Sequence, residues 1–288
     1  MMAILLTGGT GKTSIRLARM LQDSKIPFLL ASRSASVVAP PGMPATKFDW
    51  LDPSTFANPF QHAFPNGEKI SAIYLIAPEV SDPAPAMNAL VDLAVEKHGV
   101  KRFVLLTGTS VEEMGYYTGP VWQHFEDIGV EYCVLRPTWF MENFSEWEQV
   151  VLIRDESKIY TACGDGKIPF ISADDIAAVA FRALTDEKPQ YTDYKVLGPE
   201  LLSYNDIAVK FSKALGREIT HVKLSAEEQE RRLQKLGMSE QFAKLLTSLE
   251  VRTAGGFEEQ MNDVVAQVTG RPPKKFDRWV QDNKATWE

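Results

Sequence analysis

Cysteine is scarce in this chain of 288 residues, which contains only Cys133 and Cys163. Their spacing matches neither a zinc site nor a redox pair, so we expect a reduced, cytoplasmic protein. An excess of basic charge is also missing, because 31 Lys and Arg are outnumbered by 38 Asp and Glu, giving a net charge of −7. Sequence-independent binding to nucleic acid needs a basic surface, so the sequence argues against a nucleic-acid partner.

Long apolar runs are absent as well. No stretch approaches the ~20 apolar residues of a membrane-spanning helix, so no membrane association is expected. The apolar start, residues 1–6, has no basic region before it and stops at glycines, which predicts a buried strand instead of a secretory signal. With 44% hydrophobic and 24% charged residues, the composition is that of a globular protein of one large domain or two small ones.

Short apolar runs alternate with helical stretches in the first half of the chain. The runs lack polar alternation, as is typical of strands buried on both faces of a parallel sheet. The predicted strands are Ala3–Thr7, Phe28–Ser32, Ile70–Ala77, Arg102–Thr107 and Tyr132–Leu135. The predicted helices between them are Ser14–Gln22, Met87–His98 and Pro120–Ile128. This alternation predicts a doubly wound α/β fold with right-handed crossovers.

The second half is mainly helical. A strand at Ile168–Ser172, a helix at Asp174–Leu184 and a strand at Tyr191–Leu197 are expected to complete the sheet domain. Three further helices are predicted at Ser203–Leu215, Ser225–Leu236 and Ser239–Leu249. Ser225 and Glu228 have the spacing of a capping box. We therefore expect a sheet domain of residues 1–138 and 168–198, and a smaller, mainly helical substrate-binding lobe of residues 139–167 and 199–288.

A glycine-rich segment directly after the first strand is the strongest chemical signal. Glycines there let the backbone turn tightly and approach a pyrophosphate at the start of a helix. The segment consists of Thr7, Gly8, Gly9, Thr10, Gly11, Lys12 and Thr13. A triphosphate P-loop would need a glycine five positions before Gly11, where Leu6 stands. A glycine turn without a ligand is the other alternative, and the third small position is Ser14 instead of glycine.

The choice of dinucleotide follows from a missing carboxylate. NAD sites place an acidic residue near the end of the second strand, but none occurs between Asp23 and Asp49. That strand ends in Ser32, Arg33 and Ser34, and Arg33 can pair with a 2′-phosphate, although it could also be a solvated surface residue. NADP(H) and a Rossmann domain are therefore predicted. Further cofactor contacts are expected at the ends of the next two strands, from Ala77, Pro78 and Thr107.

The active site lacks a catalytic pair. Short-chain dehydrogenases normally protonate a carbonyl with a Tyr assisted by a Lys four residues later, but no lysine lies between residues 101 and 158. Tyr191 and Lys195 have this spacing, but a strand would hold them about 13 Å apart. The remaining candidates for catalysis are Tyr116, Tyr117, Glu113 and Glu142.

Aromatic side chains are concentrated between Met114 and Trp147, interleaved with glutamates. Core packing is the alternative for any single ring, since aromatic side chains bury large areas. As a group, aromatic faces and carboxylates suit a planar cationic substrate. The candidate pocket residues are Trp122, Trp139, Phe140 and Phe144. The histidines, His62, His98, His124 and His221, show no ligand spacing, so no metal site is predicted.

Several segments together resemble the NmrA-like, atypical short-chain dehydrogenase family. They are Thr7–Lys12, Val100–Val104, Leu135–Asn143, Ile171–Ala177, Leu197–Ser203 and Thr269–Phe276. Within this family, residues 11–14 and 27–34 are similar to the fungal festuclavine and agroclavine dehydrogenases of ergot alkaloid biosynthesis. The resemblance covers essentially the whole chain.

This resemblance implies NADPH-dependent reduction of a tetracyclic iminium ion, formed from chanoclavine-I aldehyde, to a clavine alkaloid. Hydride addition to an iminium gives a neutral amine, so no general acid is required, and the protein mainly positions the reactants. Two alternatives stay open, a non-catalytic NADP-sensing regulator and a quinone or isoflavone-type reductase. The isoflavone branch relies on a lysine that residues 102–157 lack. We expect a monomer or a homodimer.

Overall fold

The computed structural model describes residues 2–34, 39–146 and 148–288, so Trp147 of the aromatic segment lies outside the described residues. The chain divides into two compact units. The first comprises the segment ending at Pro137, Ala173–Val196 and Gln267–Gly270, and the second comprises Thr138–Ser172, Leu197–Ala266 and Arg271–Glu288. Residues 168–172, which the sequence assigned to the sheet domain, thus belong to the second unit. Among the described residues, no helix has the length and apolar character needed to cross a bilayer.

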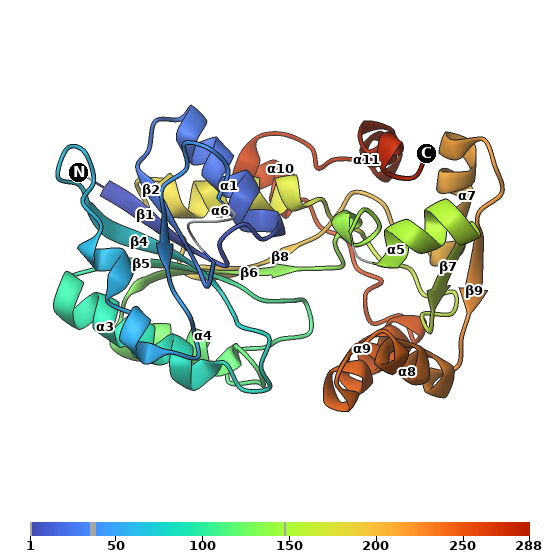
Figure 1. The fold of residues 1–288 in the computed structure, drawn as a ribbon, viewed down its shortest axis with the longest axis horizontal. Helices are drawn as coiled ribbons and strands as arrows, with labels where there is room; N and C mark the ends of the chain where they lie inside the picture. Colours follow the sequence, from blue (N-terminus) through green and yellow to red (C-terminus); the bar gives the residue numbers. More distant parts are fainter. Residues whose placement is uncertain (1, 35–38, 147) are drawn as a thin grey trace. The chain divides into compact units, whose positions relative to one another are not determined.

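The first unit is built on a parallel sheet (Figure 1). Its seven described strands are ordered β3-β2-β1-β4-β5-β6-β8, and every adjacent pair is parallel. They are β1 Met2–Thr7, β2 Phe28–Ser32, β3 Ala45–Lys47, β4 Lys69–Ile76, β5 Arg102–Leu106, β6 Glu131–Pro137 and β8 Thr192–Val196. Residues 3–7 of β1 are fully buried, as expected for a strand covered on both faces.

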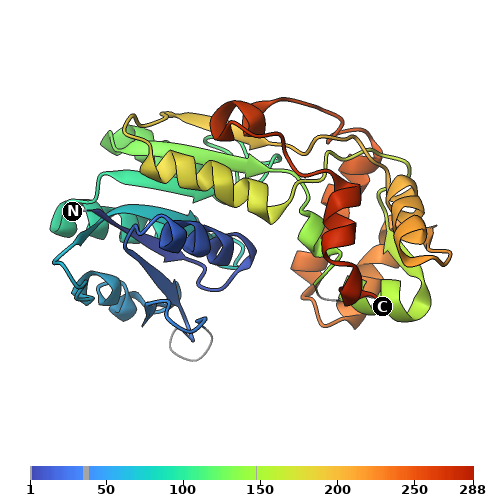
Figure 2. The ribbon, with the colours of Figure 1, turned by 90° about the horizontal axis from the view of Figure 1, so that it is seen from above.

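Helices cover both faces of this sheet, which confirms the doubly wound α/β fold. Helices α1 (Lys12–Asp23) and α6 (Ala173–Thr185) lie side by side on one face, as Figure 2 shows. Helices α3 (Ala84–His98) and α4 (Gly119–Ile128) cover the other face. Each turns an apolar stripe inward, and in α1 this stripe includes Leu17 and Leu21, both fully buried.

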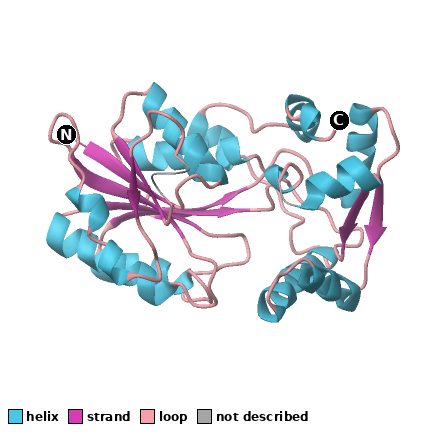
Figure 3. Ribbon diagram, in the orientation of Figure 1, coloured by secondary structure: helices cyan, strands magenta, loops and turns pink. Residues whose placement is uncertain are grey.

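The second unit is mainly helical, with one small parallel sheet of β7 (Lys158–Thr161) and β9 (Thr220–Lys223) (Figure 3). Its main helices confirm the predicted ones and are α7 Tyr204–Leu215, α8 Ala226–Lys235 and α9 Glu240–Ala254. The capping box of Ser225 and Glu228 is present, as predicted. The shorter helices along this part of the chain are α5 Glu148–Val151, a π-helical turn at Leu152–Glu156, α10 Val264–Thr269 and α11 Phe276–Asp282.

The predicted strand at residues 168–172 is wrong. Its two ends form single bridges to different partners, Leu202 and Phe140, instead of one ladder. Pro169 has no N–H to donate to a ladder, and its carbonyl accepts a hydrogen bond of 2.8 Å from the Gly198 amide. A Cβ on Gly198 would overlap the backbone of Phe170, so the two chain segments pass each other in close contact here.

Candidate functional site

The predicted cofactor residues meet at the carboxyl edge of the sheet. The glycine-rich turn follows β1, Arg33 follows β2, Ala77 and Pro78 follow β4, and Thr107 follows β5. These four strands are consecutive in the sheet, in the order β2-β1-β4-β5. The strand order reverses between β1 and β4, and ligands of open α/β sheets bind at such a switch point, outside the carboxyl ends of the strands. The fold therefore brings these residues to one edge.

The backbone of the glycine-rich turn needs glycine at two positions. Gly8 and Gly9 have φ values of +80° and +52°, in the left-handed region. A Cβ on Gly9 would overlap the Ser32 side chain at the end of β2, and one on Gly8 would lie 2.9 Å from the Ile76 side chain at the end of β4. The turn is thus packed against both neighbouring strands.

The amino end of α1 has the features of an anion site. Its N-cap is Gly11, no side chain caps it, and its first turn contains no acidic residue. The first amides of such a helix lack intrahelical partners and carry a partial positive charge. The hydroxyls of Thr13 and Ser14 are engaged within the fold, since Thr13 accepts from Tyr74 at 3.1 Å and Ser14 donates to the Thr7 carbonyl at 2.9 Å. A phosphate would therefore meet backbone amides here.

Two consequences follow for neighbouring residues. Ser14, bulkier than the glycine common at this position, is tolerated because its hydroxyl hydrogen-bonds the strand it packs on. Arg33 is exposed, and among the residues that the structure describes it has no ion-pair partner. Its guanidinium is therefore available to an anionic ligand.

The segment between β5 and α4 carries Tyr116 and Tyr117. The Thr107 and Thr118 hydroxyls, at its two ends, share a hydrogen bond of 2.6 Å. Tyr117 donates to the Pro78 carbonyl at 3.2 Å, whereas Tyr116, 48% exposed, shares a hydrogen bond with Ser110. Burial and the nearby Glu79 carboxylate raise the pKa of Tyr117 above its ordinary value. Tyr117 therefore keeps its proton at neutral pH.

The two candidate carboxylates differ in environment. Burial and the neighbouring Glu126 carboxyl raise the pKa of Glu113, which makes its anionic form less favourable. Glu142, in the second unit, is 1% exposed and accepts a hydrogen bond of 3.1 Å from the Trp279 indole. Glu142 therefore forms part of the core of its unit.

The candidate pocket aromatics fall into two groups. Phe144 is 2% exposed, and its ring centroid lies 5.5–5.8 Å from four other rings. Those rings belong to Phe170, Tyr204, Phe211 and Phe276. Trp122 is also buried, in the core of the first unit. Trp139 and Phe140 are half-buried, so they retain surface that a ligand could contact.

Replacing Glu142 by alanine should reduce the free energy of unfolding and leave the turnover number of the folded protein unchanged. The change leaves the buried Trp279 N–H without its acceptor, at a cost of about 1–3 kcal/mol. Denaturant unfolding measures this loss, and Glu218→Ala, at an exposed position of the same unit, is the control. A fall in turnover with unchanged stability would contradict the structural role.

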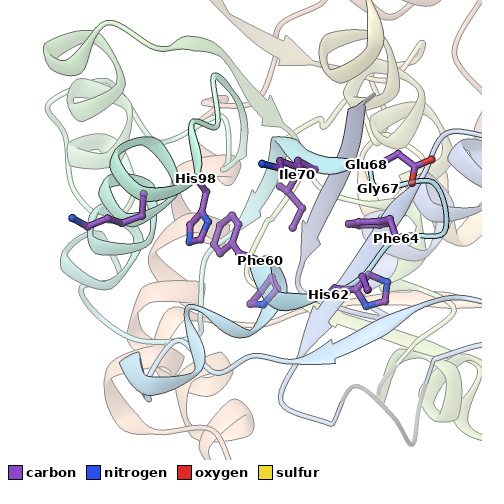
Figure 4. A pocket seen from close by; sticks show the side chains of 11 residues that line it. Phe60, His62, Phe64, Gly67, Glu68, Ile70 and His98 are labelled. Carbon is purple, nitrogen blue, oxygen red and sulfur yellow. The ribbon is translucent and has the colours of Figure 1, made fainter.

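A pocket of about 400 Å³ lies at the opposite edge of the sheet, near the start of β4 (Figure 4). Its lining includes Phe60 and His98, whose rings stack at 4.0 Å, and His62 packed edge-on against Phe64. None of the predicted cofactor residues lines it. This pocket is therefore separate from the cofactor edge.

The other two histidines have protein partners. His124 contacts the Asp92 carboxylate at 2.7 Å, and His221 lies between Thr161 and Asn205. Burial lowers the pKa of His221 to about 4, so it is neutral at physiological pH. No group of three or more metal-binding side chains is found among the described residues.

Sequence reasoning missed the residues that hold this edge together. Tyr74 supports the start of α1 from β4, and Thr118 closes the segment that begins at Thr107. Both act across the fold, and Tyr74 is 61 positions from its partner Thr13. No local pattern indicates such contacts.

Comparison with known proteins places these features in a family. The NmrA-like family model matches residues 2–279. Festuclavine synthase II from Penicillium roqueforti is 45% identical over 289 residues, covering 99% of this chain and 100% of that protein. Agroclavine dehydrogenase from Claviceps fusiformis is 43% identical over 294 residues, covering 99% of each. The crystal structure of an Escherichia coli NADPH-dependent quinone oxidoreductase in complex with NADPH shares the fold, with a TM-score of 0.80 and 21% identity. The match covers 97% of this chain and 99% of that chain. The protein is thus an oxidoreductase, and it belongs to the NmrA-like family.

Proposed function

We propose that this protein is an NADPH-dependent reductase that transfers a hydride to the iminium carbon of a tetracyclic alkaloid precursor. The substrate would be the iminium formed from chanoclavine-I aldehyde, and the product a clavine such as festuclavine or agroclavine. The observation that carries the substrate class is the 43–45% identity to a festuclavine synthase and an agroclavine dehydrogenase along their whole lengths.

The residues at the sheet edge fit a dinucleotide with a 2′-phosphate. The uncapped amino end of α1 offers amides to a pyrophosphate, and Gly9 lets the turn lie against Ser32. Arg33, with no described carboxylate paired to it, suits a 2′-phosphate. When bound, NADPH supplies the hydride. The chain's part is to orient the cofactor and to hold the substrate in near-attack geometry.

The charge change of the reaction explains why no proton donor is needed. An iminium cation becomes a neutral amine on accepting hydride, so no alkoxide has to be protonated. The Tyr117 hydroxyl donates to the Pro78 carbonyl, and its pKa is raised. Tyr117 would therefore bound the substrate site through packing and would not act as an acid.

The direct test is reduction of chanoclavine-I aldehyde, with and without an added thiol or amine to promote cyclisation, by the purified protein and NADPH. Consumption of NADPH is followed by absorbance and the product by mass spectrometry. A clavine product supports the proposal. NADPH binding without turnover of any offered alkaloid or quinone would favour a regulator that senses NADP, and turnover of quinones alone would favour a quinone reductase.

A mechanistic prediction concerns the two tyrosines. Tyr116→Phe and Tyr117→Phe should each slow single-turnover reduction of a preformed iminium by less than the 10²–10⁴-fold typical of losing a general acid. Because the pKa of Tyr117 is raised, its protonation state is constant from pH 6 to 8, and the rate should show no titration of this group. A collapse of the rate in either variant would show that a proton donor is required, and a carbonyl or quinone substrate would then be favoured.

A further inference from the structure

Arg136, at the carboxyl end of β6, is a buried cation shared between the sheet and the segment 107–118. The residue is 3% exposed. On the sheet side, its Nη1 donates to Asp193 of β8 at 2.8 Å. On the other side, its Nη2 donates to the Glu112 carboxylate at 2.5 Å and to the Thr109 carbonyl at 3.1 Å. One guanidinium thus joins two strands to the segment that carries the candidate tyrosines.

The backbone carbonyl of Glu112 is also in close contact with the rest of this segment. It accepts a hydrogen bond of 3.0 Å from the Gly115 amide. A Cβ on Gly115 would lie 2.8 Å from this oxygen and one on Gly119 2.5 Å from it, so the backbone closes tightly around Glu112. Met114 and Tyr117 have φ values of +53° and +62°, which non-glycine residues adopt only where surrounding contacts enforce them.

The far end of the segment is tied to the cofactor edge. Tyr117, held in its left-handed conformation, reaches the Pro78 carbonyl after β4, and Thr118 reaches Thr107 after β5. The segment therefore has two fixed sides, one at the ends of β4 and β5 and the other at Arg136. Of the Arg136 partners in this segment, only Glu112 contributes an opposite charge.

We propose that Arg136 is a positioning residue that holds Glu112, and through it the strained turn bearing Tyr117, in place before the cofactor binds. The inference rests on the proposed function, in which Tyr117 lies beside the reacting groups without donating a proton. A buried guanidinium suits this role, because its position is fixed by the fold and its charge-assisted hydrogen bonds are short and directional. A turn fixed in advance keeps the reacting atoms in near-attack geometry, to which rates are very sensitive.

The two carboxylates that flank Arg136 provide a matched test. Glu112→Ala removes the carboxylate in the turn, and Asp193→Ala removes the carboxylate in the sheet. Each variant therefore deprives the Arg136 guanidinium of one negatively charged partner. Glu112 is largely exposed, so its replacement should not prevent folding. Glu112→Gln, which keeps an oxygen acceptor, is the conservative variant.

Amide hydrogen exchange without cofactor is the readout that does not depend on activity. In Glu112→Ala, exchange of residues 110–118 should accelerate by about tenfold or more, while in Asp193→Ala it should stay within about twofold of the parent. With cofactor, Glu112→Ala should lower kcat by about tenfold or more with NADPH affinity nearly unchanged, since the phosphates bind elsewhere. Glu112→Gln should recover part of both effects.

Unchanged exchange of residues 110–118 in Glu112→Ala would overturn the inference. So would a parallel loss of stability, NADPH affinity and kcat in both alanine variants, because the ion pairs of Arg136 would then stabilise the fold as a whole and not the turn in particular. Accelerated exchange in Glu112→Ala, in a protein that proves not to bind NADPH at all, would support the role of Arg136 in holding the turn and refute the proposed function.

Discussion

Replacement of Gly11 by valine is expected to abolish NADPH binding while leaving the protein folded, with only a small fall in the unfolding temperature. Gly11 is the N-cap of α1 and has φ −60° and ψ 164°, values that any residue adopts. A Cβ there would meet only the Gly8 carbonyl, at 3.1 Å, so the backbone needs little adjustment. The branched side chain would instead stand beside the uncapped amides that a pyrophosphate needs. We expect at least a hundredfold loss of affinity, about 2.7 kcal/mol.

Thermal denaturation with and without NADPH measures both parts of this prediction. At a concentration of 100 times its Kd, a ligand adds about 2.7 kcal/mol of stability to the parent, and this increment should vanish in the variant. Gly9→Val is the contrasting control. Gly9 has a positive φ and its side chain would overlap Ser32, so that variant should lose stability as well as binding. If NADPH stabilises Gly11→Val as much as the parent, the phosphates bind at another place.

Arg33→Asp should weaken NADPH binding by about 1–3 kcal/mol and leave NADH binding almost unchanged. The guanidinium can form charge-assisted hydrogen bonds with a 2′-phosphate, which NADH lacks, and a carboxylate in its place would repel that group. Arg33 stands at the end of β2, exposed and next to the glycine-rich turn in the sheet order. Fluorescence titration with each cofactor gives the two affinities.

The control for this variant is Arg19→Asp, the same substitution at an exposed position on α1. It changes the net charge of the unit equally, so it separates a local contact from the general electrostatic field. Equal losses of NADPH affinity in the two variants, or equal losses for NADPH and NADH in Arg33→Asp, would remove Arg33 from the 2′-phosphate site.

Much of the first unit could be predicted from the sequence because its signals are local. The strands β1, β2, β4 and β5 are unbroken apolar runs, and burial on both faces of a parallel sheet requires such runs. The glycine-rich turn is recognisable because Gly8 and Gly9 adopt φ values that favour glycine. Tyr191 and Lys195 have the spacing of a catalytic pair, but residues 192–196 form β8, which confirms the strand predicted there.

The aromatic segment shows where local patterns stop being sufficient. Phe144 and Glu142 stand in a stretch of rings and carboxylates that suggested substrate contacts. In the structure, the partner of Glu142 is Trp279, 137 positions along the chain, and Phe144 packs on rings from several distant segments. The composition of a segment indicates which side chains bury area, but it does not indicate what they are buried against.

The same limit applies to the segment that carries Tyr116 and Tyr117. The sequence by itself determined most helices and strands of the first unit, the glycine-rich turn after β1 and the basic residue after β2, since each depends on residues close together in the chain. Only the tertiary structure brought Arg136, Glu112 and Asp193 together, because they lie in β6, after β5 and in β8, and meet only once these strands are paired. Periodicity and turn chemistry specify elements, whereas ion pairs between elements depend on how the chain returns to the same edge of the sheet.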